Sequence, residues 1–115
     1  MNSLVTVFKQ LREIMLEAAA DRVVNCDEPG NLVLHTGRID PKTGKPDWFG
    51  AVSVKKSYVA YHLIPLYNDP SLGADMSEGL SKRRQGKSCF NFKTVDSALF
   101  AELADLTVKA NGRQG

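Results

Sequence analysis

The residues best suited to chemistry are four cations that fall within six positions, beside a Gly-Lys-Ser triplet. They lie in the stretch SKRRQGKSCFNFK and are Lys82, Arg83, Arg84 and Lys87. Guanidinium and ammonium groups suit phosphate and carboxylate ligands. The stretch therefore indicates an anion site, a nucleic-acid patch, or a helix end whose cations complement the helix dipole.

The triplet Gly86-Lys87-Ser88 does not form a P-loop. That motif needs a glycine five residues before Gly86, where this sequence has Ser81. It also needs a helix after the serine, whose N-terminal amides hold the phosphate, whereas CFNFK alternates as a strand does. The pattern predicts anion binding without nucleotide hydrolysis.

Aromatic residues upstream could complete such a site. Tyr58 and His62 offer hydrogen-bond donors and stacking faces, and Lys55-Lys56 would lie near if the last strand neighbours their hairpin. Cations and aromatics mixed on a sheet are one way to hold single-stranded nucleic acid, but the sequence has no recognised motif for it. The predicted ligand-binding residues are Lys82, Arg84, Lys87, Tyr58 and His62.

Cys89 raises the question of a thiol enzyme. Nearby cations favour a thiolate, yet the sequence locates neither an orienting group nor an oxyanion site for a catalytic dyad. A half-buried strand cysteine is the alternative interpretation. The cysteines and histidines also lack the close paired spacings of structural zinc sites. We therefore expect a binding or adaptor domain rather than an enzyme, and no cofactor.

Size and composition set the frame for this site. The 115 residues suit one domain, residues 1–115, and a net charge of +2 does not by itself identify a nucleic-acid binder. No apolar run approaches the roughly 18 residues that cross a bilayer, and the charged N-terminus does not resemble a signal peptide. With only two cysteines, a reduced cytoplasmic protein is expected.

The elements that must position these residues can be predicted from periodicity. Apolar residues recur every three or four positions from Leu4, which predicts an amphipathic helix capped by Asn2 or Ser3 and reaching about Ala20. RVV and NLVLHT flank a Pro-Gly turn and predict a hairpin, and WFGAVSV and SYVAYHLI predict two further antiparallel strands.

The second half of the chain adds a short helix, a strand and a long helix. Ser77 is expected to cap a helix through about Gln85 that Gly86 ends, before the strand SCFNFK. Asp96 is expected to cap the final helix, which Asn111-Gly112 would stop.

The fold class predicted is α+β: an antiparallel sheet of about five strands, with the N- and C-terminal helices on one face and a short helix before the last strand. The helices cover only one face, so either Tyr58 and His62 or the opposite set with Tyr61 lies outside the core. Loops, a second copy of the protein, or a ligand would meet that outer face. A homodimer is therefore one of the alternatives.

Two segments, SYVAYHLIPLYNDP and KRRQGKSCFNFKTVDSALFAELADLT, resemble the YdhG-like family of small bacterial domains of unknown function. The resemblance spans roughly residues 31–110, and QGKSCFNF followed by the acidic-capped LFAEL helix is its most specific part. It implies a compact α+β domain with helices flanking an antiparallel sheet. It implies little about chemistry.

A branch of that wider family has been linked to frataxin-like iron handling, which uses an acidic ridge on the first helix. In this sequence the corresponding carboxylates are Glu13, Glu17 and Asp21, spaced four residues apart. The resemblance therefore implies an iron- or metal-handling chaperone as the alternative function. A solvated helix face, with Arg12 and Arg22 interleaved, is the competing interpretation.

Overall fold

The structure is a computed structural model that describes residues 4–20, 22–39, 41–44, 46–68, 70–74, 76–86 and 88–114. Asp21 and Lys87, both proposed from the sequence as ligand residues, lie outside the described residues. So do the helix caps proposed at Asn2 and Ser3. Among the described helices, none combines the length and apolar character needed to cross a membrane.

The sheet has six strands, all antiparallel, in the order β1-β2-β3-β4-β6-β5. The α+β class is confirmed, and the strand beyond the five expected is β5, two residues long at one edge. The strands are β1 (Val23–Glu28), β2 (Asn31–Ile39), β3 (Pro46–Val54), β4 (Val59–Leu63), β5 (Arg84–Gln85) and β6 (Cys89–Phe92).

The helical segments are α1 (Leu4–Ala18), α2 (Pro65–Asn68), the 3-10 helix η1 (Pro70–Gly73), α3 (Glu78–Arg83) and α4 (Ser97–Gln114). Two predicted caps are confirmed. The Leu80 N–H donates to Ser77 Oγ at 3.2 Å, and the Leu99 N–H donates to Asp96 Oδ1 at 3.1 Å.

Two predicted helix ends were wrong. The short helix α3 stops at Arg83, and the next two residues pair with β6 as strand β5. Gly86, with φ of 74°, therefore serves the turn between those strands instead of ending a helix. At the other end of the chain, α4 continues through Asn111-Gly112 to Gln114, because a glycine in ordinary helical geometry weakens a helix without ending it.

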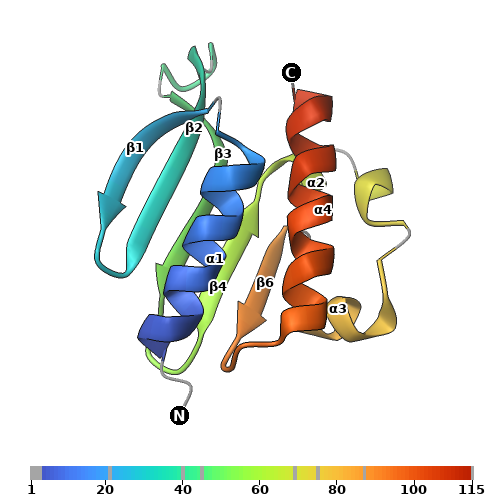
Figure 1. Cartoon of the computed structure of the whole chain (residues 1–115). Coiled ribbons are helices and arrows are strands. Elements are labelled where there is room, and N and C mark those ends of the chain that lie inside the picture. The colour runs from blue at the N-terminus through green and yellow to red at the C-terminus, as the bar shows by residue number, and fades with distance from the viewer. Residues whose placement is uncertain are drawn as a thin grey trace.

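The helices form one layer over one face of the sheet. Figure 1 shows α1 and α4 side by side on the same face, and α2, η1 and α3 each contact α4. The strand residues that join the core under this layer are Leu32, Leu34, Phe49, Val52, Val59, Tyr61, Leu63, Phe90 and Phe92. Phe90 and Phe92 therefore belong to the core, as the alternation of the last strand predicted.

Tyr61 decides which face of β4 the helices cover. Its side chain is fully buried, and its hydroxyl lies 2.7 Å from Thr107 Oγ1 on α4. Thr107 donates its own hydroxyl hydrogen to the Leu103 carbonyl at 2.8 Å, so Tyr61 is the donor in the pair. Burial also raises the pKa of the Tyr61 phenol. Because neighbours on a strand alternate, His62 faces the other side.

Candidate functional site

The face of the sheet opposite α1 and α4 carries the candidate site, and we call it the open face. Register places its residues opposite one another, because directly paired residues of antiparallel strands share a face. Its members, taken in sheet order from β1, are Val23, Cys26, Glu28, Asn31, Val33, His35, Trp48, Ala51, Ser53, Ala60, His62, Cys89, Asn91 and Gln85. Small and polar side chains dominate, in contrast to the large apolar side chains of the helix side.

His62 lies at the middle of one row on this face, with Ala51 on one neighbouring strand and Cys89 on the other. Its ring is half-buried. Burial lowers the pKa of His62, and the nearby Lys55 ammonium lowers that pKa further. The imidazole is therefore mainly neutral at neutral pH, with one nitrogen able to donate and the other able to accept a hydrogen bond.

Lys55 lies in the turn that joins β3 to β4, at the end of this face. Its backbone N–H donates to the Tyr58 carbonyl at 2.8 Å, which closes the turn. Its side chain is exposed, and its charge acts on both His62 and Cys89. Lys55 was predicted to lie near the cations around Arg84 if the last strand neighbours this hairpin. The pairing of β4 with β6 meets that condition, but Arg84 lies on the helix side of the sheet.

Cys89 has the properties of a structural thiol. Its Sγ donates to Asn91 Oδ1 at 3.5 Å, and burial raises the pKa of Cys89 despite an opposing effect of Lys55. The prediction that nearby cations favour the thiolate of Cys89 was therefore wrong, because desolvation raises the thiol pKa more than the neighbouring charge lowers it. A thiol that stays protonated at neutral pH is a poor nucleophile.

Hydrogen bonds continue across the open face toward β1. Ser53 Oγ donates to Asn31 Oδ1 at 3.0 Å, and Asn31 Nδ2 donates to Cys26 Sγ at 3.5 Å. These bonds link β3, β2 and β1 and hold the side chains in fixed positions. Both cysteines are free.

The far end of the open face carries an aromatic pair. His35 and Trp48 stack with ring centroids 6.1 Å apart, and Trp48 is 48% exposed while His35 is buried. Among the described residues, His35 Nε2 has no hydrogen-bond partner. An exposed tryptophan braced by a second ring offers a rigid apolar contact surface.

The structure brings together some of the predicted ligand residues and separates others. Tyr58 and His62 belong to the open face by strand alternation. Arg84 pairs with the core residue Phe90, and its Nη1 lies 3.7 Å from where a Cβ on Gly73 would stand, so it lies on the helix side. Lys82 is exposed on α3, with its Nζ 3.7 Å from Glu78 Oε1. Lys82 and Arg84 are therefore separated from Tyr58 and His62.

The structure describes two of the three carboxylates that the metal-handling hypothesis requires. Glu13 and Glu17 are exposed on α1 and four residues apart, while Asp21 lies outside the described residues. Within the described part of the chain, no group of three or more His, Cys, Asp or Glu side chains is placed to hold a metal ion. The structure thus adds no observation in favour of metal handling.

In comparisons with known proteins, no family model matches this sequence, and no curated protein or solved structure is significantly similar to it. The resemblance to the YdhG-like family stays a prediction. The open face is therefore interpreted from its own residues.

Proposed function

We propose that this protein is a binding domain whose open face binds an acidic segment of a partner protein. The observation that carries the proposal is the position of Lys55 in the turn between β3 and β4, where its backbone N–H bonds to the Tyr58 carbonyl and continues the register that pairs Ala51 with His62. An exposed lysine at the end of a sheet face that the helix layer does not cover is available to a carboxylate from outside.

His62 and Tyr58 would add to this interaction. A neutral imidazole donates one hydrogen bond to a carboxylate, and it gains a positive charge if the ligand raises its pKa. Tyr58 is half-buried beside the same turn and supplies a hydroxyl donor. Lys55, Tyr58 and His62 are thus the residues to which we assign anion contacts. Lys82 and Arg84 have no part in this site.

Two features favour a protein segment over a small anion. In a phosphate pocket the donors usually converge on one point. Here the donors lie along a sheet face instead. The face also ends in the half-exposed Trp48, a residue type that often anchors protein interfaces. An extended acidic segment with an apolar residue at one end fits both features.

Titration of the isotope-labelled protein with a hexaglutamate peptide, followed by two-dimensional amide NMR, tests the proposal. We expect shifts confined to residues 53–62 and 88–91 that weaken as salt is raised. Lys55→Ala should reduce affinity about fivefold, since an exposed charge contact contributes at most about 1 kcal/mol. His62 should titrate at a higher pH with the peptide bound, because the carboxylates favour its charged form.

Lys82→Ala is the matched control, because it removes one exposed ammonium from the other side of the sheet. The affinity of this variant should stay within about twofold of that of the unaltered protein, since Lys82 is on α3 and away from the open face. An equal loss of peptide affinity in Lys55→Ala and Lys82→Ala would mean that binding depends only on the net charge of the protein. Shifts centred on α3, or none at all, would remove the open face as the site.

A further inference from the structure

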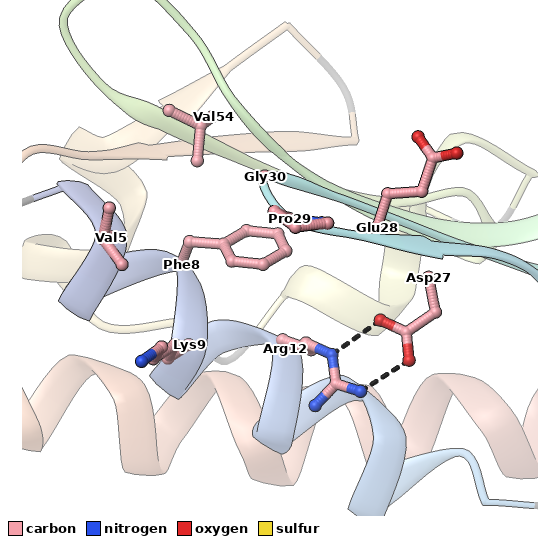
Figure 2. A pocket seen from close by; sticks show the side chains of 9 residues that line it. All are labelled: Val5, Phe8, Lys9, Arg12, Asp27, Glu28, Pro29, Gly30 and Val54. Carbon is pink, nitrogen blue, oxygen red and sulfur yellow. Dashed lines mark hydrogen bonds and ion pairs between the residues drawn. The ribbon is translucent and has the colours of Figure 1, made fainter.

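A groove lies on the helix side of the sheet, between α1 and the end of the β1–β2 hairpin. Its volume is about 750 Å³, within the range of roughly 300–1,000 Å³ common for small-molecule sites. Figure 2 shows the Phe8 ring directed from α1 toward Pro29 at the hairpin turn. Val5 and Val54 add apolar surface, so the interior of this groove is mainly hydrocarbon.

The groove follows from how α1 sits on the sheet. This helix packs on β3 and β4, and β1 lies two strands away from β3 at the sheet edge. The hairpin is held beside Val54, whose N–H donates to the Gly30 carbonyl at 2.8 Å. One bridge spans the gap: Arg12 donates to both Asp27 oxygens, from Nε at 2.8 Å and from Nη2 at 2.5 Å. The groove is therefore bounded by a helix, a strand and an ion pair.

Two cations, Lys9 and Arg12, and two anions, Asp27 and Glu28, are among the residues that line the groove. Asp27 is neutralised by Arg12, and its pKa is lowered by the hydrogen bonds from that guanidinium. Glu28 pairs with Asn31 on the opposite face, and Figure 2 shows its carboxylate directed away from the groove. Lys9, three residues before Arg12, makes no ion pair with any described residue. One uncompensated cation thus stands beside an apolar cleft.

We propose that this groove binds a free hydrophobic carboxylate, a small molecule with an alkyl or aryl body and one carboxylate group. The body would pack on Val5, Phe8 and Val54, where water is displaced from apolar surface. The carboxylate would meet Lys9 and the Nη1 donors of Arg12, which the bonds to Asp27 do not use. The proposal is independent of the open face, which lies across the sheet.

Titration with octanoate, octanol and octylammonium, three ligands with the same chain and different heads, tests the charge and the body separately. Methyl NMR should show saturable shifts at Val5 and Val54, with affinity in the order octanoate, octanol, octylammonium. Lys9→Ala should weaken octanoate about fivefold, as expected for one charge contact of about 1 kcal/mol, and leave octanol unchanged. Lys109→Ala, on α4, should change neither.

Val5→Asp should reduce binding of all three ligands, because it places a carboxylate in the apolar wall. Val108→Asp is the matched control: both valines are exposed on helices, 59% for Val5 and 57% for Val108, so both variants should fold. Circular dichroism melting checks that. Equal binding of the three ligands, no saturable shift with octanoate, or an equal effect of Val108→Asp would overturn the proposal. Dimerisation with groove shifts in ligand-free protein would instead assign the groove to a second copy.

Discussion

At the scale of single residues, the burial and the pKa of each titratable group on β4 depend on which face of the sheet the group occupies. His62 and Tyr61 are neighbours in the chain, yet Tyr61 is sealed under α4 and His62 is half-open beside Lys55. Burial acts on both by disfavouring the charged form, which raises the pKa of the phenol and lowers that of the imidazole. The same physical cause thus produces shifts of opposite sign.

His62 should make stability depend on pH. The pKa of His62 is lowered in the folded protein, so between that value and the ordinary 6.5 the unfolded chain binds more protons. The free energy of unfolding should therefore fall as pH drops from 7.5 to 5.5. Urea denaturation at both pH values should show a smaller difference for His62→Gln. An unchanged difference would mean that His62 does not contribute.

At the scale of elements, the fit of α1 on β3 depends on one residue without a side chain. A Cβ on Gly50 would stand 2.7 Å from Met15 Cε and 2.8 Å from the His62 carbonyl oxygen. Both distances are too short, and the second involves backbone of β4. Gly50 therefore permits the close approach of helix α1 and the strand pair.

Gly50→Ala should destabilise the protein by about 1–3 kcal/mol, the usual cost of overpacking a core. Gly112→Ala is the control, since a Cβ there meets nothing within 4 Å and the residue is in α4. That change should be neutral or stabilise by up to about 1 kcal/mol, through helix propensity. Chemical denaturation measures both, and a Gly50→Ala protein as stable as Gly112→Ala would contradict the packing argument.

At the scale of the whole molecule, the sheet has two different edges. β5 is only two residues long, whereas β1 has six residues and exposes Val23 and Val24 by about half. Strands β3 and β4 have neighbours on both sides and carry the core. The sheet is therefore most strongly held at its centre.

Amide hydrogen exchange should reflect this order. Amides of β3 and β4 should exchange slowest, because they open only with the core. Amides of β1 that point away from β2 should exchange fastest among the strands, since a strand edge leaves them to water. NMR-detected exchange measures both sets. Slow exchange along the outer side of β1 would mean that another chain covers this edge in solution.

The sequence by itself determined the types of the longer elements and several of their boundaries, whereas the short segments α2, η1 and β5 were not predicted. Ser77 and Asp96 are caps because their side-chain oxygens accept from backbone amides three residues on. The alternation in CFNF placed Phe90 and Phe92 in the core. These features depend on residues close in the chain, where short-range geometry decides. The end of α3 was misjudged because pairing with β6, a tertiary contact, draws Arg84 into a strand.

Only the tertiary structure decided which face of the sheet carries the site. The strand around Tyr61 and His62 has apolar residues on both sides, and period-two alternation separates two faces without saying which one a helix will cover. The buried bond from Tyr61 to Thr107 settles that choice. The same packing puts Arg84 on the helix side and leaves His62 on the open face, because helix placement depends on residues distant in the chain.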